Sequence, residues 1–91
     1  MFVVVSYDIV DDRTRYKVFK TLLDYGTRVQ RSVFECIVDQ RKLEEMITRV
    51  SKYLNEQEDT LRVYNLCEGC LKKTEVFGKG HLTEDEDVYI I

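Results

Sequence analysis

Proline is absent from this chain of 91 residues, and glycine occurs only four times. Fibrous and low-complexity disordered proteins are usually rich in these residues, so their scarcity argues against both classes. A hydrophobic content of 44% beside 34% charged residues is that of an ordinary folded protein. Because a chain this short can bury only about 60 to 65% of its unfolded surface, we expect one core and a single domain over residues 1–91.

Long apolar runs are missing as well. No stretch approaches the roughly 18 to 20 apolar residues that a membrane span needs. Met1 leads straight into the apolar residues 2–5, without the basic segment or the small-residue cleavage site of a secretory signal. The sequence therefore predicts a cytoplasmic protein that makes no contact with a membrane.

Cysteine is scarce and odd in number, since the chain has only Cys36, Cys67 and Cys70. In a reducing compartment we expect thiols and no disulfide framework. Cys67 and Cys70 have the spacing of half a zinc site, but structural zinc needs four ligands, and only Cys36 and His81 remain to complete it. The sequence leaves the role of the pair open. It contains no glycine-rich phosphate-binding loop and no Ser-His-Asp arrangement of suitable spacing.

The apolar pattern predicts four strands and two helices. The strands are expected over residues 2–8, 27–30, 32–38 and 59–67. The first helix is capped by Asp11 or Asp12 and ends before Gly26, and the second is capped by Asp39. The order βαββαβ is typical of an α+β, ferredoxin-like fold, with a core over about residues 1–67.

Each predicted helix has an apolar stripe at a spacing of three to four residues, which we expect to face the sheet. The stripe of the first helix consists of Tyr16, Phe19, Leu22 and Leu23, and that of the second of Leu43, Met46, Ile47, Val50, Tyr53 and Leu54.

Two helices cover only one face of such a sheet, yet both faces carry apolar residues. In the first strand, Phe2 and Val4 on one face alternate with Val3, Val5 and Tyr7 on the other. In the third strand, Val33 and Ile37 flank a glutamate on the face opposite Phe34, Cys36 and Val38. An exposed apolar patch usually marks an interface, and the commonest closed solution is a two-fold homodimer, here packed sheet to sheet. Asp8 shares the face of Phe2 and Val4, so we expect it near the dimer axis.

Positive charge is concentrated in one segment of a chain whose net charge is −3. Residues 13–31 carry six basic side chains against one acidic, a net +5 that favours contact with an anion, with phosphate the leading candidate. Arg13, Lys17 and Lys20 form a stripe on the first helix, for which a plain solvated surface is the alternative. The residues predicted to contact nucleic acid are Arg13, Arg15, Lys17, Lys20, Arg28 and Arg31.

Asp8 ends the first strand, which places its carboxylate at the rim of the sheet. One carboxylate is a poor metal site, but two carboxylates brought together by a dimer axis form a candidate Mg²⁺ site, because this ion takes one or two carboxylates with waters and substrate phosphates. The alternative is a strand-end aspartate that only shapes a turn.

Three segments carry a family resemblance: VVVSYDI (residues 3–9), DYGTRVQRSVFEC (24–36) and DTLRVY (59–64). In this order they resemble the smaller of the two core CRISPR adaptation proteins, a family often called the CRISPR-associated endoribonucleases. The resemblance covers about residues 2–66.

The resemblance implies a homodimer of ferredoxin-like folds in which Asp8 is the Mg²⁺ ligand and catalytic residue, with Mn²⁺ as a substitute. It also implies a partner, the CRISPR integrase, and a DNA duplex held across basic surfaces, with single-stranded RNA as a further substrate. Other positions that match family positions implicated in nuclease activity or nucleic-acid contact are Tyr7, Arg15, Arg28, Ser32 and Phe34.

Three functions follow as hypotheses. The first is a CRISPR spacer-acquisition protein that binds nucleic acid with the integrase and has Mg²⁺-dependent endonuclease activity, on RNA or DNA, at Asp8. The second is a non-catalytic scaffold in the same assembly. The third, a ligand-sensing ferredoxin-like regulator, is disfavoured by the basic stripe.

The chain from residue 68 to 91 is predicted to be an extension that contacts a partner protomer or the integrase. Residues 74–77 are expected to form an extra strand that joins the sheet of the partner protomer. The acidic residues 84–87 are interpreted as a linker, and the apolar residues 88–91 as a terminal strand.

Overall fold

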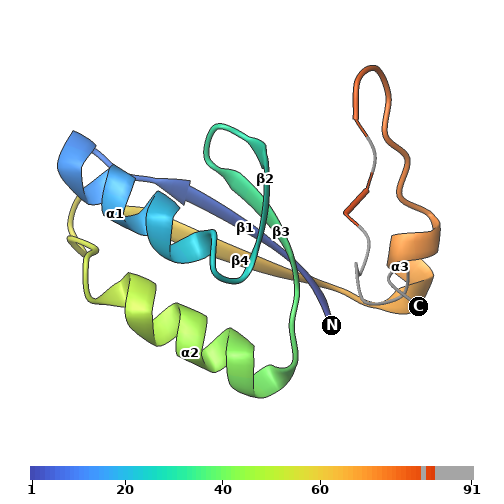
Figure 1. Cartoon of the computed structure of the whole chain (residues 1–91), viewed down its shortest axis with the longest axis horizontal. Helices are drawn as coiled ribbons and strands as arrows, with labels where there is room; N and C mark the ends of the chain where they lie inside the picture. The colour runs from blue at the N-terminus through green and yellow to red at the C-terminus, as the bar shows by residue number, and fades with distance from the viewer. Residues whose placement is uncertain (81, 84–91) are drawn as a thin grey trace.

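The computed structural model describes residues 1–80 and 82–83 and contains four strands and three helices (Figure 1). In chain order the elements are β1 (Phe2–Asp8), α1 (Asp12–Leu22), β2 (Gly26–Gln30), β3 (Val33–Ile37), α2 (Gln40–Ser51), β4 (Thr60–Leu66) and α3 (Glu68–Lys72). The predicted order βαββαβ is confirmed, with α3 as an additional element. No helix in the described part of the chain is long and apolar enough to cross a membrane.

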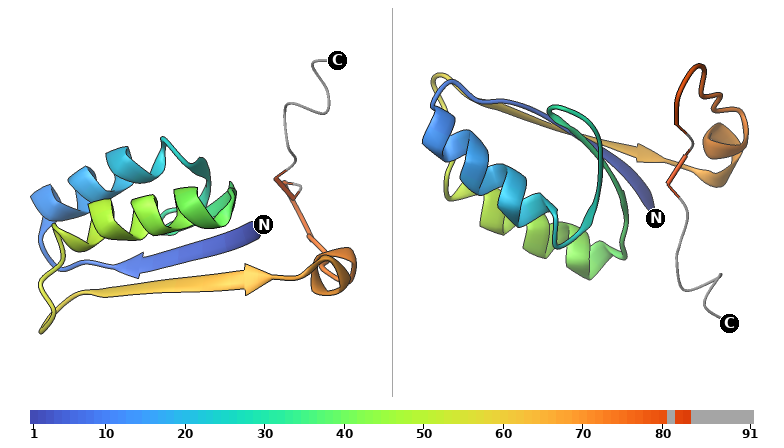
Figure 2. Two further views of the ribbon diagram at one scale, coloured as in Figure 1. Left: turned by 90° about the horizontal axis from the view of Figure 1, so that it is seen from below. Right: turned by 45° about the horizontal axis from the view of Figure 1, so that its top comes forward.

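The four strands form one sheet of order β2-β3-β1-β4, in which all neighbours are antiparallel. β1 is therefore an inner strand: its residue Val4 lies between Glu35 of β3 and Tyr64 of β4. Figure 2 shows α1 and α2 side by side on one face of the sheet. Among the described elements no helix covers the other face, which we call the open face.

Side chains of β1 alternate between the two faces, as the pleat of a strand requires. Val3, Val5 and Tyr7 are buried under the helices, whereas Asp8 on the open face is exposed. The core under the helices is one cluster, and its other buried members are Ile9, Val18, Leu22, Tyr25, Phe34, Cys36, Leu43, Met46 and Val50.

Both helices begin at predicted aspartate caps. Asp11 caps α1, where its carboxylate accepts a hydrogen bond from the backbone N–H of Thr14 at 2.8 Å. Asp39 caps α2 in the same way through the N–H of Lys42, also at 2.8 Å. Each carboxylate satisfies one of the free N–H groups at a helix start, so these short polar residues fix where the helices begin.

The predicted apolar stripe of α1 is partly wrong. Tyr16 and Leu23 are exposed, at 61% and 45%, and the buried face consists of Val18, Thr21 and Leu22. Thr21 enters the core because its hydroxyl donates to the carbonyl of Lys17 at 2.8 Å and so carries no unpaired donor. At about 100° per residue, a face centred on these three residues turns Tyr16 and Leu23 away from the sheet.

The stripe of α2 is largely as predicted. Leu43, Met46 and Val50 are buried, and Ile47 and Leu54 pack against the core cluster. Tyr53, which follows the helix, is 42% exposed.

The extra C-terminal strand is not formed within this chain. Cys67 caps the short helix α3 directly after β4, and residues 74–77 then have no regular secondary structure. A strand needs a neighbouring strand for its backbone hydrogen bonds, and the helix redirects the chain beyond the end of the sheet (Figure 1). Strand addition to a second protomer stays a prediction, and the predictions for residues 84–91 lie outside the described residues.

Gly26 marks a close approach between β2 and β3. A Cβ at this position would lie 2.4 Å from the backbone oxygen of Glu35 and 2.5 Å from the Sγ of Cys36. The Glu35 oxygen belongs to the paired strand β3, so it cannot yield without disturbing the pairing of Gly26 with Cys36.

We predict that Gly26→Ala lowers the free energy of unfolding by about 1–3 kcal/mol, the usual cost of overpacking. The matched control is Gly69→Ala, because a Cβ there would meet only the Sγ of Cys67, at 3.9 Å. Urea denaturation followed by circular dichroism measures both. Equal stability of the two variants would contradict the close approach at Gly26.

Candidate nucleic-acid interface and metal site

Asp8 stands at the rim of the open face. It is the last residue of β1, pairs with Thr60 of β4 and is exposed. With Ser6, Arg62 and Tyr64 it lines a shallow hollow of about 260 Å³. The hollow therefore brings a carboxylate, a guanidinium and a phenol together on the face that α1 and α2 leave uncovered.

The loop that follows Asp8 is held from two sides. Arg15 of α1 donates from Nε to the carbonyl of Ile9 at 3.1 Å and from Nη2 to that of Val10 at 3.3 Å. Asp59 accepts from the N–H of Val10 at 3.0 Å and from that of Asn55 at 2.9 Å. Arg15 and Asp59 are thus positioning residues for the strand end that carries Asp8.

Tyr7 points to the other face and is 4% exposed. Its hydroxyl donates to the carbonyl of Arg31 at 3.3 Å, and its N–H donates to that of Ser32 at 3.1 Å. Burial raises the pKa of Tyr7, and the charges of Arg28 and Arg15 only partly oppose this, so the phenol is protonated at neutral pH. Tyr7 therefore acts as a donor that ties the β2–β3 turn to β1.

The turn tied by Tyr7 brings Arg28 and Arg31 beside Arg15. These three arginines line a cleft of about 350 Å³, which we call the basic cleft. Its other lining residues are Tyr7, Asp12, Tyr16 and Phe19. The guanidinium of Arg28 lies 4.8 Å from the centre of the Phe19 ring, a cation–π arrangement. Arginines interleaved with aromatic rings suit phosphate contact and base stacking.

The predicted basic stripe lies next to this cleft on the outer surface of α1. Arg13, Lys17 and Lys20 are all exposed. None of the three forms an ion pair within the residues that the structure describes, and the ammonium of Lys17 lies 5.8 Å from the Tyr53 ring. Within this part of the chain, no carboxylate neutralises their charges.

The residues predicted as one catalytic group are divided by the fold. Tyr7, Arg15 and Arg28 belong to the basic cleft, and Asp8 lies on the open face, outside it. Phe34 is fully buried between the rings of Tyr7 and Phe19, so direct contact with a substrate is excluded for it. Ser32 meets Tyr7 through its backbone carbonyl.

Sequence reasoning missed Asp59, Arg62 and Tyr64. Asp59 holds the loop after Asp8, and Arg62 and Tyr64 share its hollow. The pKa of Arg62 is raised by its interaction with the Tyr64 hydroxyl. All three lie in the segment at residues 59–64 that carries part of the family resemblance. Antiparallel pairing of β1 with β4, in the register that joins Asp8 to Thr60 and Ser6 to Arg62, places this segment beside Asp8.

A divalent cation fits this hollow poorly in a single chain. Asp8 is its one carboxylate, Arg62 adds a positive charge, and no group of three His, Cys, Asp or Glu side chains suited to a metal occurs among the described residues. Magnesium usually takes one or two carboxylates with substrate phosphates. A site for it would therefore need a second Asp8 or a bound phosphodiester.

Comparison with known proteins gives a consistent result. The model of the family described as "CRISPR associated protein Cas2" matches residues 1–74. The chain is 41% identical to CRISPR-associated endoribonuclease Cas2 3 of Chloroflexus aurantiacus, over 100% of this chain and 98% of the relative.

Solved structures agree with this match. Streptococcus pyogenes Cas2 at pH 6.5 aligns with a TM-score of 0.74 and 32% identity, over 86% of this chain and 100% of that protein. A chain of a partial Cas6-RT-Cas1–Cas2 complex aligns with a TM-score of 0.66 and 34% identity, over 82% and 88% of the two chains. The match spans the elements that carry Asp8 and the basic cleft, and this chain belongs to the family of CRISPR-associated proteins Cas2.

Proposed function

We propose that this chain is a CRISPR adaptation protein that binds nucleic acid across its helix side, as a homodimer and in an assembly with the CRISPR integrase. The observation that carries the proposal is the gathering of cations on the helix side, in the basic cleft and in the exposed stripe on α1. Membership of the Cas2 family supports it, as does the alignment with a chain from a complex that contains Cas1. The element and strand orders support the ferredoxin-like assignment.

The open face supports the dimer. Tyr64, Ile37 and Val29 are 48%, 37% and 41% exposed, although they are large apolar residues of the sheet. A second copy packed sheet to sheet would bury this face on both chains. It would also turn the helices of both copies outward, so the dimer would present two cationic surfaces, one on each side.

We predict a dimeric mass by light scattering at micromolar concentration. Tyr64→Glu places a charge on the open face and is expected to shift the protein toward monomer, whereas Tyr53→Glu, on the helix side and 42% exposed, is expected to leave the dimer intact. A monomeric wild type would overturn the sheet-to-sheet arrangement.

Binding of duplex DNA should depend strongly on salt, because each neutralised phosphate releases counterions and steepens the log–log slope by about 0.9. We predict that changing Arg13, Lys17 and Lys20 together to Ala flattens that slope by up to about 2.7. Fluorescence anisotropy over a salt series measures it, with single-stranded RNA as a second substrate.

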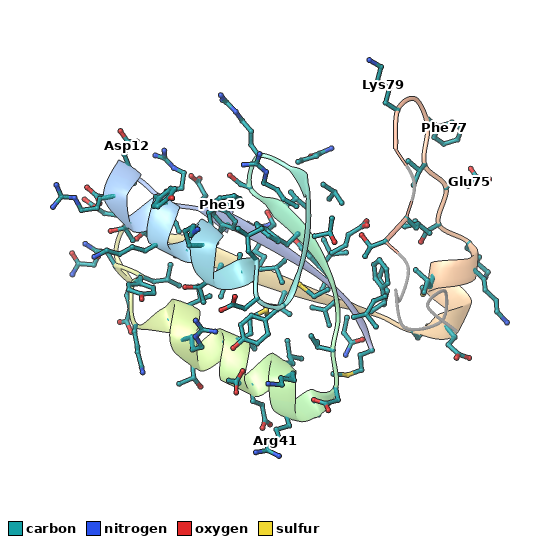
Figure 3. The ribbon with its side chains drawn as sticks, in the orientation of Figure 1. Asp12, Phe19, Arg41, Glu75, Phe77 and Lys79 are labelled. Carbon is teal, nitrogen blue, oxygen red and sulfur yellow. The ribbon has the colours of Figure 1, made fainter. Side chains whose placement is uncertain are left out.

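The matched control removes the same charge elsewhere, by changing Arg41, Lys52 and Lys72 to Ala. All three are exposed and lie off the basic stripe, with Arg41 at the start of α2, away from Asp12 and Phe19 (Figure 3). If both triple variants reduce the slope equally, the effect is one of net charge and the stripe is only a solvated helix face.

The finer proposal is a Mg²⁺-dependent phosphodiesterase at Asp8, with RNA or DNA as substrate and Mn²⁺ as a substitute. Two Asp8 carboxylates that meet across the dimer axis would supply the ligands that one chain lacks, and the bound ion would polarise the scissile phosphate. Arg62 lies in the same hollow and would offer charge to that phosphate. The endoribonuclease name of the Chloroflexus relative supports this activity.

We predict that Asp8→Asn abolishes Mg²⁺-dependent cleavage of RNA and duplex DNA while leaving dimerisation and DNA binding intact, because it keeps the shape and removes the charge. Glu56→Gln, an exposed residue outside this hollow, is the control that removes one acidic charge. Cleavage by purified Asp8→Asn protein at the wild-type rate would exclude this site as the nuclease.

The non-catalytic scaffold is favoured by one observation: the cations and Asp8 lie on different faces of the chain. Nucleic acid bound in the basic cleft of a sheet-to-sheet dimer would lie on the outside, whereas both Asp8 residues would lie near the inside. If neither wild type nor Asp8→Asn cleaves, and both support integration by the partner integrase, the protein acts as the scaffold alone.

A further inference from the structure

Cys67 and Cys70 occupy the joint between the sheet and the C-terminal segment. Cys67 follows the last residue of β4 and caps α3, and Cys70 lies in the first turn of that helix. The backbone N–H of Cys70 donates to the Sγ of Cys67 at 3.4 Å. Both side chains are free thiols on an exposed surface.

The first turn of α3 brings the two cysteines within reach of one another. The turn is closed by the hydrogen bond from the N–H of Leu71 to the carbonyl of Cys67, at 2.9 Å. Residues three apart in such a turn have Cα atoms within about 7 Å, and a disulfide spans about 4.4 to 6.8 Å between Cα atoms. The Cys67 sulfur already lies on the side of Cys70, so little backbone movement is needed to join them.

The two thiols differ in reactivity. The hydrogen bond from the Cys70 N–H lowers the pKa of Cys67, because it stabilises the thiolate. The thiolate of Cys67 in turn raises the pKa of Cys70, which keeps its proton. Gly69 has no side chain to shield the Cys67 sulfur, and a Cβ at that position would lie 3.9 Å from it. Cys67 has the properties of an attacking thiol and Cys70 those of a resolving thiol.

Cys36 provides an internal contrast. It is fully buried in β3 under the helices, and burial raises its pKa to about 11. A thiol in this state is neither accessible nor ionised near neutral pH.

We propose that Cys67 and Cys70 are a reversible dithiol–disulfide pair that exchanges with low-molecular-weight disulfides. The Cys67 thiolate attacks one sulfur of the small disulfide, forms a mixed disulfide and releases one small thiolate. Cys70 then loses its proton and attacks the Cys67 sulfur, which releases the second small thiolate and leaves the Cys67–Cys70 disulfide. Two electrons pass from the protein to the small disulfide.

The disulfide would fasten the start of the C-terminal segment. After α3 the chain returns toward β2 and β3, where the N–H and hydroxyl of Thr83 donate to the carboxylate of Glu35 at 3.0 and 2.7 Å. A hollow of about 550 Å³ lies between residues 75–80 and β2. Phe77 is among its lining residues and is 83% exposed; Figure 3 shows it on the loop that follows α3. Cys67 and Cys70 thus lie where the C-terminal segment leaves β4, and a disulfide between them would restrain the direction in which that segment starts.

The test is intact-mass analysis of the folded full chain after incubation with glutathione disulfide at neutral pH. Wild type is expected to lose two hydrogen atoms per chain, and Cys36→Ser is expected to do the same. Cys70→Ser is expected to retain one glutathionyl group, on Cys67. Cys67→Ser is expected to react more slowly, because the hydrogen bond that lowers the pKa of Cys67 comes from the backbone N–H of Cys70 and is made to the Cys67 sulfur.

The sign of the pH dependence gives a second readout. A lowered pKa means that Cys67 is alkylated at lower pH than Cys70, so the iodoacetamide rate of Cys70→Ser should rise at lower pH than that of Cys67→Ser. Equal profiles for the two variants would overturn the proposal. Three other results would also overturn it: a wild-type chain that accumulates two glutathionyl groups, wild-type chains that cross-link to one another, and a wild-type chain that binds Zn²⁺ and no longer reacts with glutathione disulfide.

Discussion

The alternation of side chains along β1 is the constraint on which the rest of this structure depends. β1 is one of the two inner strands and pairs on both sides, so its register is fixed by β3 and β4 together. Because Tyr7 and Asp8 are consecutive, one must point under the helices and the other to the open face. A single peptide unit thereby separates the basic cleft from the candidate metal hollow, although both lie at the same end of the strand.

Polar contacts convert this alternation into two defined surfaces. Tyr7 holds the β2–β3 turn through two backbone carbonyls and so places the cations of that turn over α1. Arg15 donates to the carbonyls of the loop after Asp8 while its positive charge stays at the basic cleft. Its Nη1 pairs with the carboxylate of Asp12 at 2.8 Å, so Arg15 shapes the loop, while Arg28 and Arg31 supply the other two guanidinium groups of the cleft.

The basic cleft and the hollow at Asp8 differ in whether one chain supplies all the groups that each would need. The cations of the basic cleft all belong to one chain, so the proposed nucleic-acid binding would need only an outward-facing α1 and β2–β3 turn. The hollow at Asp8 holds one carboxylate and one arginine, so metal chemistry there needs a second chain or a phosphodiester. The proposed binding would therefore be a property of the protomer, and the proposed cleavage a property of the assembly.

Local sequence determined the elements: Asp11 and Asp39 begin the helices, and alternating apolar residues mark the strands and Asp8 as a strand end. It also showed the basic segment, since charge is read without a fold. What only the tertiary structure decided depends on distant contacts. Thr21 is buried in place of Tyr16 because of the angle at which α1 meets the sheet, and Asp59 reaches Val10 across 49 positions in the chain. Phe34 matched a functional position yet lies in the core, since a match in sequence does not specify which face a strand presents.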